Sequence, residues 1–235
     1  MFPKKYWFVL LTYFLMFVFT AFAPLLLHFG LGIDGASSIV YANVIGFIGA
    51  LIIVLLLMWE FLAKEKREFP ISVGTIIGWT FLGLIMAYAS QIIAATIETD
   101  LLGIKVGSEN TEMIVDFARQ SPLFILVPAI VGPILEELVF RKILFGTFYK
   151  RWNFLVAVIL SSLIFAVLHM DLVHTLIYFA MGVVFAFLYV KTKRIIVPIL
   201  VHMLMNTIVV VTQLSIDPEL LKELQEQASF IFFGG

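Results

Sequence analysis

The chain contains no cysteine, which excludes disulfide bonds, thiolate metal sites and a cysteine nucleophile. Charge is also scarce: Asp, Glu, Lys and Arg make up 13% of the 235 residues, against about 25% in a typical soluble domain. The 15 basic and 16 acidic side chains nearly cancel, and no basic tract with interleaved aromatic residues occurs. The composition therefore gives no indication of a nucleic-acid partner.

Hydrophobic residues, in contrast, make up 62% of the chain, and the mean hydropathy is +1.09. A typical soluble domain is about 45–50% apolar. The sequence therefore predicts an all-α, polytopic membrane bundle of about seven transmembrane helices, in a multi-pass protein of the cell membrane. The apolar runs that approach the length of a membrane span are Tyr6–Leu27, Tyr41–Leu62, Val73–Ile97, Leu123–Phe148, Phe154–Leu168, Leu172–Tyr189 and Ile195–Leu214.

Basic residues gather in alternate gaps between these runs. Their positions are Lys4, Lys5, Lys64, Lys66, Arg67, Lys150, Arg151, Lys191, Lys193 and Arg194. Because basic residues favour the inner side of a membrane, the N-terminus is expected inside and the C-terminus outside. The acidic segment Glu98–Ser121 is expected to form a surface helix on the outer side. The tail Asp217–Ala228 has the pattern of an amphipathic helix that opens on Asp217 and Pro218.

Two adjacent glutamates and an arginine lie inside the fourth apolar run. Each ionised side chain at bilayer depth costs about 2.5–3.5 kcal/mol on the lenient insertion scale, so partners or a polar cavity must compensate it. Glu137 and Arg141 are four residues apart, on one helix face, and can pair. Glu136 lies about 100° further around the helix, and burial beside a second carboxylate suits it to act as a general base. Pro128 and Pro133 are expected to kink this helix and make room for water beside Glu136.

Two later runs carry further polar side chains at the spacing of one helix face. Phe165 and His169 are four residues apart at the end of the fifth run, and His202 and Asn206 are four apart in the seventh. Each of these residues alone is more often a packing or interfacial residue than a catalyst. Together with the glutamate pair they indicate a polar site inside the membrane.

The three segments read Glu-Glu-x-x-x-Arg, Phe-x-x-x-His and His-x-x-x-Asn, in this order on successive apolar helices. They resemble the CPBP family of type II CAAX prenyl endopeptidases, also called the Abi family, over roughly Ser121–Leu214. The resemblance makes residues 121–214 the catalytic helical core. Residues 1–120, with three helices and the acidic outer segment, precede this core, and residues 215–235 are expected to follow it as an amphipathic tail.

The resemblance implies an intramembrane endopeptidase that cleaves a membrane-associated peptide or protein with a glutamate-activated water. In that reaction Glu136 is the general base, and His169 helps to bind and orient the water. His202 and Asn206 stabilise the tetrahedral oxyanion, a role that preorganised donors perform well in a dry site. Supporting roles fall to Glu137, Arg141 and Phe165.

No cofactor is favoured, although Glu136, His169 and His202 are also an acceptable three-ligand zinc set. A proton-coupled transporter would use buried Glu and His residues as a relay, but internal repeats typical of transporters are not evident. A non-catalytic scaffold or immunity protein with a vestigial site is a further alternative. The expected partners are a membrane peptide or protein and the lipid bilayer, and the sequence does not indicate an oligomeric state.

The depth of the site residues poses a difficulty for upright helices. At 1.5 Å per residue, His202 lies about 10 Å and His169 about 22 Å from the inner ends of their runs. If both share a site with Glu136, the fifth and sixth runs must form a short, tilted or sunken hairpin. We therefore predict that the hairpin tip, His169–Leu172, is buried inside the protein.

Overall fold

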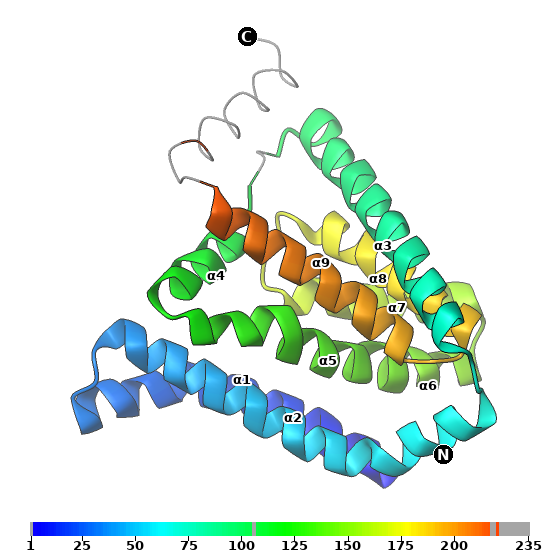
Figure 1. Cartoon of the computed structure of the whole chain (residues 1–235), viewed down its shortest axis with the longest axis horizontal. Coiled ribbons are helices and arrows are strands. Elements are labelled where there is room, and N and C mark those ends of the chain that lie inside the picture. The colour runs from blue at the N-terminus through cyan, green and yellow to red at the C-terminus, as the bar shows by residue number, and fades with distance from the viewer. Residues whose placement is uncertain (1, 105–106, 217–219, 221–235) are drawn as a thin grey trace.

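The computed structural model describes residues 2–104, 107–216 and 220. The regular elements within this part of the chain are all helical, and the main α-helices are joined by short π-helical and 3-10 segments, designated η (Figure 1). In chain order the elements are α1 (Lys4–Leu25), η1 (Leu26–Gly30), α2 (Gly35–Glu68), α3 (Val73–Thr96), η2 (Ile97–Leu101), α4 (Glu109–Gln120), η3 (Pro122–Ile125), η4 (Val127–Val131), α5 (Gly132–Glu136), η5 (Glu137–Phe145), α6 (Gly146–Arg151), α7 (Phe154–Leu168), α8 (Thr175–Thr192) and α9 (Ile196–Ser215).

Six helical stretches in the described residues are long and apolar enough to cross a membrane. A seventh apolar helix, α7, has 15 residues and falls short of that length. The prediction of a multi-pass, all-α bundle with about seven membrane helices is therefore confirmed. The six long stretches are Lys4–Gly30, Gly35–Glu68, Val73–Leu101, Pro122–Arg151, Thr175–Thr192 and Ile196–Ser215.

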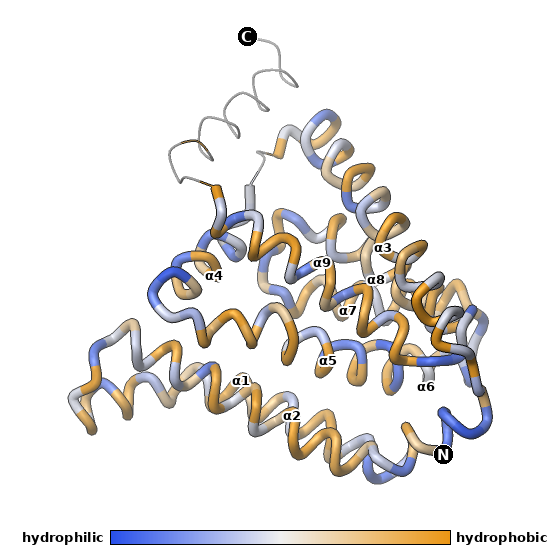
Figure 2. The backbone as a smooth tube through the Cα atoms, viewed as in Figure 1, coloured by the Kyte–Doolittle hydropathy of each residue, from blue (hydrophilic) through white to orange (hydrophobic). Residues whose placement is uncertain are grey.

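Apolar side chains cover the outside of the bundle as well as its core. Figure 2 shows hydrophobic residues along every long helix. Large apolar side chains such as Phe14, Leu56 and Phe81 are more than 60% exposed. Such a surface suits lipid, which solvates apolar side chains and leaves backbone polar groups to be satisfied within each helix.

The helices form two groups around the central segment that runs from η4 to α6. Helices α1 and α2 pack against each other as a hairpin along the lower edge of Figure 1. Helix α3 packs against α8 and α9 on the other side of the central segment, and α7 packs against α8 and η5. The largest core cluster joins the hairpin to the central segment through residues such as Val9, Val54 and Leu135.

The central segment departs twice from α-helical hydrogen bonding, at η4 and η5. In η4 the N–H of Gly132 donates to the carbonyl oxygen of Val127, five residues earlier. The next bond in this register would join residue 133 to Pro128, but Pro133 has no N–H to donate. π-helical segments occur frequently at functional sites, and here η4 and η5 lie on either side of α5, whose last residue is Glu136.

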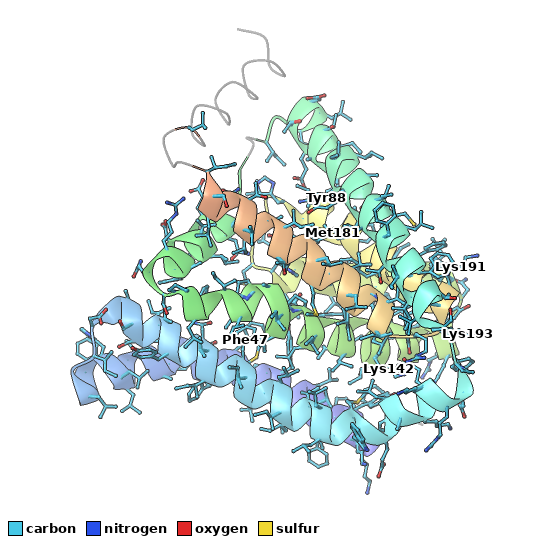
Figure 3. The ribbon with its side chains drawn as sticks, in the orientation of Figure 1. Phe47, Tyr88, Lys142, Met181, Lys191 and Lys193 are labelled. Carbon is cyan, nitrogen blue, oxygen red and sulfur yellow. The ribbon has the colours of Figure 1, made fainter. Side chains whose placement is uncertain are left out.

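A second polar cluster lies at the end of the bundle where the predicted inner loops meet. The buried carboxylate of Glu65 forms ion pairs with Lys142 and Arg194, and it also accepts a hydrogen bond of 2.8 Å from the backbone N–H of Ile195. Lys142 and Lys193 lie at this end of the molecule in Figure 3. The N-inside, C-outside orientation and the division at residues 120 and 214 stay predictions. The predicted tail helix lies outside the described residues, except for Leu220.

Candidate active site

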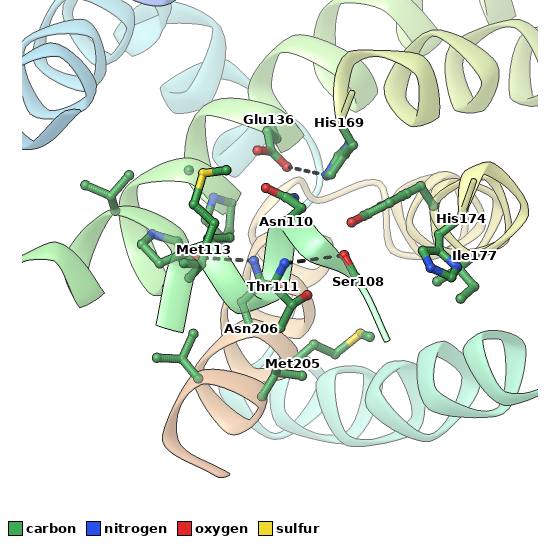
Figure 4. A pocket seen from close by; sticks show the side chains of 18 of the residues that line it. Ser108, Asn110, Thr111, Met113, Glu136, His169, His174, Ile177, Met205 and Asn206 are labelled. Atoms are coloured by element: carbon green, nitrogen blue, oxygen red, sulfur yellow. Dashed lines mark hydrogen bonds and ion pairs between the residues drawn. The ribbon is translucent and has the colours of Figure 1, made fainter. Parts of the chain in front are cut away.

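The structure brings together the four side chains to which the sequence assigned catalytic roles. Glu136 ends α5, His169 caps the C-terminus of α7, and His202 and Asn206 project from α9. The Glu136 Oε2 atom lies 3.9 Å from His169 Nε2 and 3.7 Å from His202 Nε2. Figure 4 shows Glu136 and His169 facing each other across this gap. All four residues line one cavity.

Glu137 forms the expected ion pair with Arg141, at 3.4 Å between Oε2 and Nε. Both side chains are at most 1% exposed. Glu137 also accepts, at Oε1, a hydrogen bond of 3.0 Å from His202 Nδ1, which the sequence did not predict. The two glutamates therefore lie at the two nitrogens of the His202 ring, Glu137 at Nδ1 and Glu136 at Nε2. Glu137 orients the ring that Glu136 faces.

The hydrogen bonds of the histidines determine which atoms they present to Glu136. His169 Nδ1 lies 2.8 Å from the carbonyl oxygen of Phe165, which can only accept, so Nδ1 carries the hydrogen and donates. His202 Nδ1 likewise donates to the Glu137 carboxylate. In the neutral tautomer both rings then turn an Nε2 lone pair towards an acceptor oxygen of Glu136. A donor hydrogen, from a water or an added proton, is needed to satisfy this arrangement.

Phe165 lies behind the cavity and supports the site from the core. Its ring is fully buried and packs edge-on against His169, with centroids 4.4 Å apart. The Arg141 guanidinium carbon lies 4.0 Å from the ring centroid of Phe165. The terminal nitrogens of Arg141 have no hydrogen-bond partner among the described residues, so the aromatic face supplies a favourable contact for this buried cation.

Asn206 forms a hydrogen bond with a backbone carbonyl beside the two prolines. Its Nδ2 atom donates a hydrogen bond of 2.9 Å to the carbonyl oxygen of Pro128. This oxygen lacks a backbone donor in the π-helical register because Pro133 has no N–H. The two prolines were predicted to open space beside Glu136. They also leave the Pro128 carbonyl oxygen without a backbone donor, and the hydrogen bond to this oxygen fixes one end of the Asn206 amide.

The cavity has a volume of about 680 Å³ and lies between the α1–α2 hairpin and helices α3, α4, α8 and α9. Apolar side chains such as Phe47 and Met205 form much of its wall. The predicted outer helix is present as α4, but it does not lie apart on the surface. The start of α4 covers the cavity through Asn110, Thr111 and Met113 (Figure 4). A cavity of this size with a few convergent polar groups is typical of a ligand site.

Two polar contacts at this end of the cavity were missed by sequence reasoning. Ser108 donates a hydrogen bond of 2.7 Å to Asp171, which joins the start of α4 to the hairpin tip between α7 and α8. Glu98, at the end of the third span, is buried and accepts a hydrogen bond of 2.8 Å from His174 Nδ1. Glu98 also accepts from the backbone N–H groups of Leu176 and Ile177, where α8 begins. No sequence motif signalled these contacts, which join segments more than 60 residues apart.

The prediction that the hairpin tip His169–Leu172 is buried inside the protein is wrong. His169 is partly buried, but Met170 is 81% and Leu172 66% exposed. The shared site forms nevertheless, because α7 is short and ends at His169, level with Glu136. The tip needs no protein cover, since the side chains that it exposes are apolar.

Within the described residues, no group of three or more His, Asp or Glu side chains has an arrangement that could hold a metal ion. Glu136, His169 and His202 have the residue types of a zinc site, and one carboxylate oxygen faces two imidazole nitrogens. One nitrogen of each ring is already engaged as a donor, which would leave Nε2 as the metal-facing atom. Chelation is therefore an informative treatment of this site.

Comparisons with known proteins agree on one family. The family model of type II CAAX prenyl endopeptidase Rce1-like proteins matches residues 118–208. The "Putative membrane peptidase YdiL" of Bacillus subtilis (strain 168) is 43% identical over 98% of both chains. The "Membrane-embedded CAAX protease MroQ" of Staphylococcus aureus (strain USA300) is 36% identical over 97% of both chains. No solved structure matches the chain.

The chain belongs to the Rce1-like family of type II CAAX prenyl endopeptidases. The matched residues 118–208 contain all three motif segments, including both histidines that face Glu136. The family assignment makes the chain a membrane endopeptidase by class, and the apolar helices make it a multi-pass membrane protein.

Proposed function

We propose that this protein hydrolyses a peptide bond of a membrane-associated peptide or protein with a water that Glu136 activates. One observation carries the proposal: a single Glu136 oxygen faces the Nε2 atoms of two histidines at the wall of a large cavity. The side chain of Glu136 is 19% exposed, whereas that of Glu137 is fully buried. Glu136 is therefore the carboxylate that water and substrate can reach.

His169 is suited to hold the reacting water. Its Nδ1 donates to Phe165, so its neutral ring accepts at Nε2. A water beside Nε2 and Glu136 would donate one hydrogen to each and turn a lone pair towards the substrate carbonyl. Glu136 takes a proton as the water oxygen bonds to the carbonyl carbon, and the proton passes to the leaving nitrogen as the C–N bond breaks.

His202 and Asn206 are placed to bind the oxyanion of the tetrahedral intermediate. His202 already donates from Nδ1, so it can also donate from Nε2 only as the imidazolium. An imidazolium together with Arg141 would balance the charges of Glu136 and Glu137. The Nδ2 atom of Asn206 carries two hydrogens, and one of them remains after the bond to Pro128.

Zinc bound by Glu136, His169 and His202 is the competing interpretation of the same residues. In that case the metal, rather than Glu136, would polarise the water.

The substrate is expected to be a peptide with apolar segments, because most large side chains around the cavity are apolar. The name of the staphylococcal relative includes CAAX protease, so a prenylated CAAX peptide is one candidate substrate.

The test is cleavage of a membrane-peptide library, with prenylated and unprenylated members, by the purified wild type and Glu136→Gln. Asp116→Asn, which removes an exposed carboxylate from α4, is the control for loss of negative charge. We expect Glu136→Gln to lose about 10²-fold or more in cleavage rate, the usual contribution of a general base, and Asp116→Asn to retain activity. Equal cleavage by wild type and Glu136→Gln would remove Glu136 as the base. Loss of wild-type activity with a chelator would favour zinc.

A further inference from the structure

Helix α8 presents an aromatic ring to each of the two histidines at the site. Tyr178 stacks on His169, with ring centroids 4.1 Å apart and an angle of 29° between the planes. Phe185 stacks on His202 at 4.8 Å and 23°. Tyr178 and Phe185 are seven residues, about two helical turns, apart and therefore lie on one face of α8. Neither residue belongs to the three motif segments.

Among the described residues, each imidazole has a single hydrogen bond that orients it, from Nδ1 to Phe165 in His169 and from Nδ1 to Glu137 in His202. One such bond fixes a point on the ring but leaves the ring plane free to swing about it. A stacked aromatic ring restricts this swing, because the two faces must stay parallel to keep their contact. The bond and the stack together determine where each Nε2 atom points.

We propose that Tyr178 and Phe185 are positioning residues that hold both imidazole planes so that the Nε2 atoms converge on Glu136. Phe185 is fully buried and is not among the residues that line the cavity, so it acts through His202 and not on the substrate. Its ring also lies 5.2 Å from the guanidinium carbon of Arg141. Tyr178 lines the cavity beside His169. This inference rests on the proposed function.

The experiment compares kcat and KM of Phe185→Leu, Tyr178→Leu and Tyr178→Phe on a peptide that the wild type cleaves. We expect each leucine variant to lower kcat on the order of 10- to 100-fold, since small misplacements of catalytic groups have effects of that size. The KM of Phe185→Leu should stay near the wild-type value, because this side chain does not contact the cavity. Tyr178→Phe keeps the stacked ring and should retain most of the wild-type kcat.

Phe187→Leu is the matched control, since Phe187 is a partly buried residue of the same helix that neither lines the cavity nor stacks on either histidine. Thermal unfolding shows whether each variant folds. If Phe185→Leu does not fold, Phe185→Met replaces it, because methionine fills the space without a ring. Loss of activity by Phe187→Leu equal to that of Phe185→Leu would mean that α8 packing, not ring stacking, matters, and would overturn the inference.

Combined variants test whether each ring acts through its own histidine. Phe185→Leu should add little to the loss in His202→Ala but should keep its full effect in His169→Ala, and Tyr178→Leu should show the reverse. Fully additive losses in all backgrounds would refute the positioning roles. Wild-type kcat in both leucine variants, with Glu136→Gln inactive, would refute this inference alone. Equal cleavage by wild type and Glu136→Gln would instead refute the proposed function.

Discussion

The substitution Arg141→Met tests how this chain stabilises charge in its interior. The side chains of Arg141 and Glu137 are 1% and 0% exposed, and 3.4 Å separates Nε from Oε2. Without the guanidinium, the Glu137 carboxylate keeps its hydrogen bond from His202 but loses its countercharge. Removing one partner of a buried pair costs about 3–5 kcal/mol. The variant also loses the contact with the Phe165 ring at 4.0 Å, so we expect a loss towards the upper end of this range.

The double variant Glu137→Gln/Arg141→Met separates stability from catalysis. Replacing both members of a buried ion pair by neutral groups of similar volume is often close to neutral for stability. We therefore expect the double variant to recover most of the loss and to unfold within about 1–2 kcal/mol of the wild type. Its cleavage rate should stay low, because the glutamine carries no charge to stabilise a protonated His202.

The assays are unfolding in detergent micelles, followed by the fluorescence of the four tryptophans, and cleavage of a peptide that the wild type accepts. The free energies of unfolding of the wild type, both single variants and the double variant form a thermodynamic cycle. A double variant no more stable than Arg141→Met would refute the countercharge argument. Wild-type cleavage by the double variant would show that the charge of Glu137 is not needed at His202, since a glutamine oxygen can still accept the hydrogen bond from Nδ1.

Two further predictions concern packing around the site. Asn206→Leu leaves the partly buried carbonyl of Pro128 without its side-chain donor, and we expect a loss of about 1–3 kcal/mol in unfolding free energy; an unchanged stability would show that another donor, such as a water in the cavity, replaces it. A Cβ atom on Gly182 would lie 2.7 Å from Ser162 Oγ, whereas one on Gly78 would meet no atom within 4 Å. Gly182→Ala should therefore destabilise by about 1–3 kcal/mol and Gly78→Ala should stabilise by up to about 1 kcal/mol, with the reverse order contradicting the packing.

The sequence predicted features that depend on neighbours along one helix. The apolar runs marked the membrane helices because a span requires about 20 apolar residues whatever surrounds it. The pairing of Glu137 with Arg141 followed from their spacing of four residues, which the helix places on one face. The convergence of Glu136, His169 and His202 was predicted only through the family resemblance, since helical spacing contains no information on how separate helices meet.

The sequence did not predict several of the contacts between helices. The acidic segment Glu98–Ser121 was expected to form a surface helix, but the sequence did not show that the first turn of α4 would cover the cavity. The bonds from Asn206 to Pro128 and from Ser108 to Asp171 join residues 78 and 63 positions apart. A missing N–H at Pro133 could have signalled an unpaired carbonyl, but not the identity of its donor. Such partners are set by tertiary packing, which a single sequence does not reveal.

The hairpin tip shows why depth and burial must be argued separately in a membrane protein. With 15 residues, α7 is about 22 Å long at 1.5 Å per residue, whereas the hydrocarbon core is about 30 Å thick. An upright α7 that begins at one interface therefore ends inside the hydrocarbon, with His169 at its C-terminus. Met170 and Leu172 are exposed from the protein, and their apolar side chains can face lipid. The polar members of the tip, His169 and Asp171, instead find protein partners in Glu136 and Ser108. The shared site thus requires a short hairpin, and lipid can supply the cover that the protein does not.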